Sequence, residues 1–154
     1  MKVYMGLKKV TREGLFKYGL TVYNNKGQVE YEVSKGTAIL EDKFGNALEA
    51  FIWVVKHISV LYYKGIIPDG EKVELFMDNQ VMYDWIVAES APYPYTIGLA
   101  DLLFEFSFLQ VPLEIIYTKN CVSRVTWGNT EQEKLTSIMD LFQVNKPTTE
   151  SVGV

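Results

Sequence analysis

The hydrophobic period of this chain changes near residue 44, and that change constrains the fold more than any other feature. Before it, apolar and polar residues alternate, most clearly in Val29-Glu30-Tyr31-Glu32-Val33, which is typical of a half-buried strand. After it, apolar residues recur at three- and four-residue steps, which predicts an amphipathic helix: Leu48, Phe51, Ile52, Val55, Ile58 and Tyr62. Two periods in succession predict a sheet that is covered by helices.

Local patterns predict the remaining elements. Asn24-Asn25-Lys26-Gly27, between two β-rich runs, indicates a hairpin turn. We expect strands at 2–7, 18–23, 28–33, 72–78 and 113–117. We expect helices from about 44–46 to 64–65 and at 80–89, 97–109 and 130–142. Three strands followed by alternating strands and helices favour an α/β fold, in which an antiparallel meander joins parallel strands in one mixed sheet.

Composition narrows the class of protein. The chain has 154 residues, 48% of them apolar and 22% charged, which suits one globular domain rather than a disordered chain. We expect that domain to span residues 1–143 and to be followed by a flexible tail at 144–154. Neither an apolar run of about 18–20 residues nor a signal-peptide pattern is visible, so we expect no membrane partner. A single cysteine, Cys121, indicates a reducing compartment, and we expect the cytoplasm.

Charge is spread unevenly along the chain. The formal net charge is −4, but residues 1–26 sum to +5 and residues 27–154 sum to −9. An acidic whole argues against strong non-specific binding to phosphate backbones, which needs clustered positive charge. The basic first segment allows a local contact with nucleic acid, although, taken alone, it is explained better by a solvated hairpin with ordinary lysines.

Several short motifs, in this order, resemble the ribonuclease H superfamily. The run 18–23 with the turn 24–27 is similar to that family's second and third strands, which open on a Gly-Tyr-Gly-like turn. Three more motifs are similar to the start of its first helix, the end of its fourth strand and its last helix: Asn46-x-x-Glu49, Asp78-Asn79-Gln80 and Asn129-x-x-x-Glu133-x-Leu135. The resemblance covers about residues 2–142. It implies an RNase H-like mixed five-stranded sheet flanked by helices.

The resemblance also implies a metal site. In that family four carboxylates hold two Mg²⁺ ions, which activate water and stabilise the leaving oxygen. Glu49, Asp78 and Glu133 match three of the four positions, as catalytic residues and metal ligands. The fourth position, on the opening strand, falls on Gly6, and no Asp or Glu lies within residues 1–12. We therefore expect Mg²⁺ or Mn²⁺ to bind weakly, since a hard cation needs several oxygen ligands.

Each of these carboxylates also has a purely structural interpretation. Glu49 suits the first turn of a helix, where the helix dipole favours an acid. Asp78 can be the N-cap of the following helix. Glu133 completes a capping box that begins at Thr130. The sequence leaves both interpretations open for all three residues.

Other candidates concern nucleic acid. The resemblance suggests phosphate or base contacts from two groups of residues: Lys8, Lys9 and Arg12 in and beside the first hairpin loop, and Asn46, Asn79 and Gln80 in the family-like motifs. Among the aromatic residues, Tyr93 and Tyr95 lie between prolines and are the best candidates for an exposed contact surface. We expect His57 to lie on a helix face and Cys121 to be a buried or half-exposed thiol.

Three functions compete. The first is a degenerate RNase H-like protein that binds nucleic acid or a partner protein and is catalytically impaired. The second is an active Mg²⁺-dependent endonuclease that cuts RNA in RNA–DNA hybrids. The third is a self-associating structural or accessory protein. Missing catalytic acids in a small domain of this kind suggest, by analogy alone, a viral accessory protein that acts in the host cytoplasm.

Overall fold

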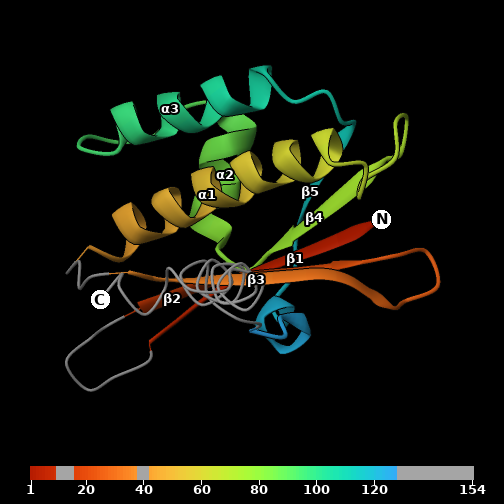
Figure 1. Ribbon diagram of the computed structural model, residues 1–154. Helices are drawn as coiled ribbons and strands as arrows, with labels where there is room; N and C mark the ends of the chain where they lie inside the picture. The colour runs from red at the N-terminus through yellow and green to blue at the C-terminus, as the bar shows by residue number, and fades with distance from the viewer. Residues whose placement is uncertain (10–15, 38–41, 128–154) are drawn as a thin grey trace, which may run out of the picture.

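In a computed structural model of the chain, which describes residues 1–9, 16–37 and 42–127, five strands form one mixed sheet (Figure 1). The strands are β1 (Lys2–Lys9), β2 (Phe16–Tyr23), β3 (Val29–Thr37), β4 (Val73–Met77) and β5 (Leu113–Tyr117). Their spatial order is β3-β2-β1-β4-β5. The pairs β1–β2 and β2–β3 are antiparallel, whereas β1–β4 and β4–β5 are parallel. This arrangement confirms the mixed sheet that the sequence predicts.

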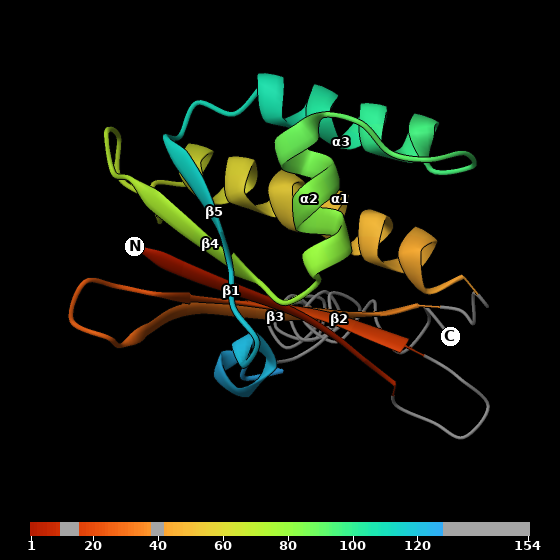
Figure 2. The same ribbon diagram turned by 180° about the vertical axis from the view of Figure 1, so that it is seen from behind.

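Helices cover one face of that sheet. The long helix is α1 (Lys43–Tyr63), and α2 (Gln80–Ala88) and α3 (Thr96–Ser107) lie on the same side. Figures 1 and 2 show the short 3₁₀ helix η1 (Cys121–Arg124) on the opposite side of the sheet. The predicted helix at 130–142 and the predicted tail at 144–154 lie outside the described residues.

The core lies between α1 and the sheet. On β1, Val3 and Met5 face α1 and are buried, as are Leu20 and Val22 on β2. The apolar stripe of α1 meets them, and four of its residues have no exposed surface at all: Phe51, Val54, Val55 and Ile58. By length and hydropathy alone α1 could cross a membrane, but half of its most apolar window is buried inside this domain. That burial is typical of a core helix.

The other face of the sheet carries a cradle of two glycines. Gly6 on β1 is paired with Gly19 on β2, and the indole of Trp127 and the side chain of Val125 lie against both. A Cβ atom added to Gly19 would approach Trp127 to 2.8 Å, and one added to Gly6 would approach Val125 to 3.2 Å. The ammonium of Lys8 lies 4.2 Å from the centroid of the Trp127 ring, within range of a cation–π contact.

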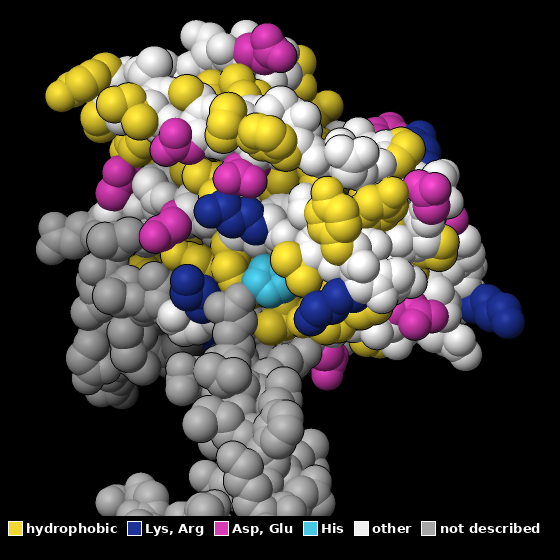
Figure 3. All heavy atoms as spheres, turned by 45° about the horizontal axis from the view of Figure 1, so that its top comes forward, with side chains coloured by type: hydrophobic (Ala, Val, Ile, Leu, Met, Phe, Trp, Pro, Cys, Tyr) yellow, Lys and Arg dark blue, Asp and Glu magenta, His cyan; other side chains and the backbone are white. Residues whose placement is uncertain are grey.

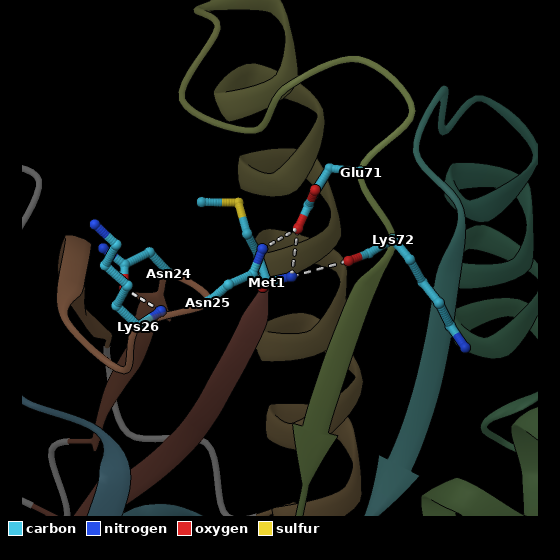
Figure 4. Close-up of polar contacts among 6 residues, drawn as sticks. All are labelled: Met1, Asn24, Asn25, Lys26, Glu71 and Lys72. Atoms are coloured by element: carbon cyan, nitrogen blue, oxygen red, sulfur yellow. Dashed lines mark hydrogen bonds and ion pairs between the residues drawn. The ribbon is translucent and has the colours of Figure 1, made fainter.

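Polar contacts join the two halves of the sheet at its other end. The amino group of Met1 donates to Glu71 Oε1 and to the carbonyl of Lys72, both at 3.0 Å. Asn25, in the β2–β3 turn, donates to the same Glu71 oxygen at 3.1 Å (Figure 4). The meander and the start of β4 are therefore held together where β1 begins.

Exposed apolar side chains gather on the outer face of α3, which Figure 3 shows as a group of yellow spheres. Tyr93, just before α3, is 91% exposed, as the sequence predicts. Ile97, Phe104 and Phe108 are 76%, 62% and 58% exposed. Tyr95 differs from the prediction, because it is only partly exposed and its hydroxyl donates to Asp42 Oδ1 at 2.7 Å.

Candidate functional site

A hollow of about 390 Å³ opens at the carboxyl ends of β1 and β4, below the first turns of α1 and α2. Most of its wall is apolar, and its few polar groups come from Lys43 and from the segment Asp78–Gln80. The described residues that line it are Met5, Gly6, Leu7, Lys43, Phe44, Ala47, Ala50, Phe51, Met77, Asp78, Asn79, Gln80, Val81 and Met82.

The sheet topology explains this position. The chain leaves β1 toward β2 on one side, and it leaves β4 through α2 and α3 toward β5 on the other. Because neighbouring parallel strands whose connections diverge leave a crevice outside their carboxyl ends, α/β proteins tend to bind ligands there. The hollow lies at this switch point.

Asp78 follows the last residue of β4 and reaches this hollow. Partial burial of the carboxylate raises its pKa above the usual value for an aspartate. The suggested N-cap role of Asp78 is wrong, because the cap of α2 is Asn79, whose Oδ1 accepts from the Met82 amide at 3.1 Å. Asp78 therefore does not cap α2, and its negative charge contributes to raising the pKa of the Cys121 thiol.

Glu49 lies elsewhere. The hydroxyl of Tyr18, on β2, donates a hydrogen bond of 2.9 Å to Glu49 Oε2. Glu49 also lines a second hollow, between α1 and the start of α3, together with Gly45, Ile52 and Tyr95. The hollow with Asp78 is lined by other residues of α1, among them Ala47 and Ala50, and Glu49 is not one of the described residues that line it. Two residues turn a helix by about 200°, so Glu49 and Ala47 point to nearly opposite sides.

Gly6 stands beside Asp78. The parallel register pairs Tyr4 with Phe76, and continuing it by two residues brings Gly6 level with Asp78. A side chain on Gly6 would start toward Val125 and Trp127, where that space is already filled. The cradle under Trp127 thus gives a physical reason for glycine at the position where the resemblance expects a bridging acid.

The carboxylates that the described residues bring to Asp78 are too few for a pair of magnesium ions. Within the described parts of the chain, no three or more His, Cys, Asp or Glu side chains lie close enough together to hold a metal ion. Each Mg²⁺ needs near-octahedral oxygen ligands, and two neighbouring ions need several carboxylates to offset their repulsion. Among the described residues that line the hollow, Asp78 is the only carboxylate. Glu133, the remaining predicted ligand, lies outside the described residues.

Comparison with known proteins identifies the architecture. No family model matches the chain, and no curated protein matches its sequence. Solved structures do match. RNase H1 from the halophilic archaeon Halobacterium salinarum superposes with a TM-score of 0.62 at 11% identity, over 80% of this chain and 89% of that one. This chain has the ribonuclease H fold.

Two further structures support the same fold. LC11-RNase H1, isolated from compost by a metagenomic approach, has a TM-score of 0.62 at 14% identity, over 80% of this chain and 91% of that one. The same enzyme in complex with an RNA/DNA hybrid has a TM-score of 0.59 at 13% identity, over 80% of this chain and 92% of that one. At such low identity the likeness establishes the fold of this RNase H-like domain and leaves its chemistry open.

The predicted nucleic-acid contacts are dispersed over the RNase H-like domain. Lys8 lies on the sheet face opposite α1, directly across from Lys17 on β2, and Lys9 ends β1. Asn46 is fully buried within α1, so it presents no surface to a ligand in this structure. Asn79 and Gln80 line the hollow beside Asp78. Arg12 lies outside the described residues.

Cys121 and His57 make contacts inside the domain. The buried Cys121 Sγ lies 2.8 Å from the carbonyl oxygen of Met5 and 3.1 Å from that of Phe76, so its single proton can be donated to either strand, β1 or β4, from the η1 side. Burial, with a smaller contribution from the negative charge of Asp78, raises the pKa of this thiol to about 12. His57 lies on α1, as expected, with its Nδ1 3.1 Å from the Trp53 carbonyl.

Sequence reasoning did not identify Lys43 and Ala47 as residues of the hollow. Lys43 opens α1 and lines the hollow across from Asp78, and Ala47 follows one turn later. The helical period could have placed both on one face of α1, since they are four residues apart. No sequence pattern indicated that this face, rather than the face of Glu49, meets the end of β4.

Proposed function

We propose that this RNase H-like domain binds nucleic acid and does not cleave it by a two-metal mechanism. The observation that carries the proposal is the separation of its two best candidate acids. Asp78 lines the hollow at the ends of β1 and β4, whereas Glu49 bonds to Tyr18 on β2 and lines a different hollow. The one carboxylate that the described residues bring to the first hollow gives two cations too little negative charge to stay close together.

The polar and positively charged groups at and near the hollow are suited to binding nucleic acid. Lys43, Asn79 and Gln80 supply hydrogen-bond donors at the mouth of the hollow, and Lys8 and Lys17 add positive charge on the other face of the sheet. LC11-RNase H1, which shares the fold, is known in complex with an RNA/DNA hybrid. Because the chain as a whole is acidic, we expect weak, salt-sensitive binding at a localised surface. The expected place of action remains the cytoplasm, of the host cell if the source is viral.

A cleavage assay tests the proposal against the active-nuclease alternative. The intact protein is incubated with a fluorescently labelled RNA–DNA hybrid in Mg²⁺ and separately in Mn²⁺, and fluorescence anisotropy measures binding in parallel. We expect binding without cleavage above a protein-free control. Cleavage by the unmodified protein that disappears in Asp78→Asn would establish the nuclease instead. Absence of binding to the hybrid, to single strands and to duplexes would also overturn the proposal.

Self-association is the second candidate, and the outer face of α3 favours it. Ile97, Phe104 and Phe108 expose most of their side chains along one stripe of that helix. Exposed apolar stripes of this kind occur at protein interfaces. Sedimentation velocity on the intact protein and on Phe104→Ser checks this candidate. Larger species that form with rising concentration and disperse in the variant would support it, and a monomer throughout would exclude it.

A further inference from the structure

We infer that the hollow at the ends of β1 and β4 receives an unpaired nucleobase, that is, a flat heteroaromatic ring with donors and acceptors on its edge. This inference deepens the proposed nucleic-acid binding and rests on it. At about 390 Å³, the hollow falls within the range of about 300–1,000 Å³ that small-molecule sites occupy. It is large enough for a ring and too apolar for a hydrated metal pair.

The apolar side chains that line the hollow can pack against the flat faces of a nucleobase. Met5 and Met77 form part of the buried floor, and Phe44 lines one side. Thioether sulfur is polarisable and makes favourable contacts with aromatic rings, and a phenyl ring can stack on or meet a base edge-to-face. The walls can therefore hold a flat apolar surface without needing a particular base.

Small residues on α1 provide the space. Two of the α1 residues that line the hollow, Ala47 and Ala50, each contribute only a methyl group. Longer apolar side chains further along α1, such as Val54 and Ile58, are fully buried in the core and do not line it. The hollow is thus bounded by the helix without being filled by it.

The polar groups suit the edge of a base. Asp78 accepts hydrogen bonds, Lys43 donates them, and the Gln80 amide does both. A purely aliphatic guest would desolvate these groups without pairing them, which costs free energy. A phosphate would meet one lysine, the Asp78 carboxylate and apolar walls. A base, with donors and acceptors on one edge, matches the set better than either guest.

Methionine methyl groups report occupancy of the hollow directly. Met5, Met77 and Met82 line it, whereas Met1 lies at the start of β1, beside Glu71. The protein with ¹³C-labelled methionine methyls is titrated with adenosine, with cytidine and with a single-stranded RNA octamer. Two further titrations use the same octamer with all its bases removed and a blunt RNA duplex. We expect adenosine or cytidine and the octamer, but not the abasic octamer or the duplex, to shift the three hollow signals and leave Met1 unchanged.

Variants locate the effect. Ala47→Leu places a branched side chain in the hollow, and Ala100→Leu makes the same change on the exposed face of α3 as a matched control. We expect Ala47→Leu to weaken nucleoside binding about tenfold, because the larger side chain takes up space that the ring would occupy, and Ala100→Leu to change it little. Asp78→Ala is the second variant, in case Ala47→Leu fails to fold, and we expect it to weaken binding of bases that carry an exocyclic amine.

The outcomes separate the inference from the function on which it rests. If intact and abasic octamers bind equally and the three methyl signals stay still, nucleic-acid binding stands and the base site is overturned. If nucleosides shift the signals but no oligonucleotide binds, the hollow is a site for free nucleosides and the proposed function falls. If neither binds, both are overturned. If the affinity for nucleosides is unchanged in both Ala47→Leu and Asp78→Ala, the base binds outside this hollow and the inference is overturned.

Discussion

The hydroxyl of Tyr18 donates a hydrogen bond of 2.9 Å to the carboxylate of Glu49, which ties β2 to the second turn of α1. Tyr18 is almost completely buried, and its ring also lies against that of Trp53. The carboxylate therefore provides a hydrogen-bond acceptor for the hydroxyl of a buried tyrosine. An acid that the resemblance assigns to a metal is, in this structure, part of the packing between the helix and the sheet.

The first prediction tests that packing role. We expect Glu49→Gln and Tyr18→Phe each to lower the free energy of unfolding by about 1 kcal/mol, because each removes or weakens one partly buried hydrogen bond. Neither variant should change nucleic-acid binding beyond what its stability loss explains. Urea denaturation measures the first quantity and anisotropy the second. Tyr93→Phe, at an exposed tyrosine, is the matched control. A loss of nucleic-acid binding in Glu49→Gln but not in Tyr18→Phe would show that Glu49 takes part in binding.

The glycine cradle gives a second prediction. We expect Gly19→Ala to destabilise the domain by about 1–3 kcal/mol, since the new methyl would lie 2.8 Å from Trp127 and Val125. The double variant Gly19→Ala/Trp127→Ala should recover part of that loss relative to Trp127→Ala alone. Gly36→Ala is the control, because nothing lies within 4 Å of its added Cβ. Thermal unfolding measures all four proteins. Equal effects at Gly19 and Gly36 would mean that Trp127 does not rest on the sheet as described.

The fold could be predicted from the sequence because it depends on patterns that repeat. Alternation in residues 29–33 and the three-to-four spacing in residues 48–62 each involve many side chains, so errors at single positions cancel. The strand at 113–117 was predicted with the bounds it has in the structure, and the others are shifted by up to four residues at an end. The ribonuclease H resemblance added the mixed five-stranded sheet, and the spatial order of the strands comes from the structure.

The site could not be predicted in the same way, because it depends on single residues. Whether Ala47 or Glu49 faces the end of β4 depends on the rotation of α1 about its axis. Residues two positions apart lie on nearly opposite sides of a helix, so a small error in that rotation exchanges them. Asp78 and Asn79 are neighbours with similar capping propensity, and only the path of the chain after β4 selects Asn79 as the cap. Trp127 lies over Gly6 from more than a hundred residues away, and such a contact leaves no local signal.

Asp42 provides a prediction about pH. Its carboxylate caps α1 through the Phe44 amide at 3.1 Å and accepts from Tyr95, and the Tyr95 hydrogen bond is the largest cause that holds the pKa of Asp42 below its usual value. A carboxylate with a lowered folded-state pKa contributes stability at neutral pH, and that contribution is lost as the pH falls through the folded pKa. We expect Asp42→Ala to cost up to about 1 kcal/mol at pH 7, because the group is exposed and screened.

The difference between Asp42→Ala and the unmodified protein should shrink toward zero in acid, below the usual aspartate pKa. Unfolding curves at a series of pH values measure it. Asp101→Ala, at an exposed aspartate on α3, controls for the general effect of removing a negative charge. If the difference in unfolding free energy stays constant with pH, the Asp42 side chain stabilises α1 through its capping hydrogen bond and not through its negative charge.

Cys121 provides a prediction about reactivity. Burial raises the pKa of its thiol to about 12, so the reactive thiolate is scarce in the folded protein at any ordinary pH. We expect a water-soluble disulfide reagent to modify Cys121 at pH 8 no faster than the domain unfolds. Absorbance of the released thiol follows the reaction, and the protein in urea provides the fast reference. Rapid modification of the folded protein would show that η1 opens readily from the sheet.

Asp78 provides the last prediction, and it separates the two interpretations of the site. Partial burial raises the pKa of this carboxylate, so its ionised form is a cost to the folded state at neutral pH. A group with a raised folded-state pKa loses stability as the pH rises through that pKa. We therefore expect Asp78→Asn to unfold at the same temperature as the unmodified protein, or slightly above it, at pH 7, and any advantage to disappear in acid. If Asp78 instead held magnesium tightly, millimolar Mg²⁺ would raise the unfolding temperature of the unmodified protein and leave that of Asp78→Asn unchanged, because only a folded state with its ligands in place gains stability from the ion.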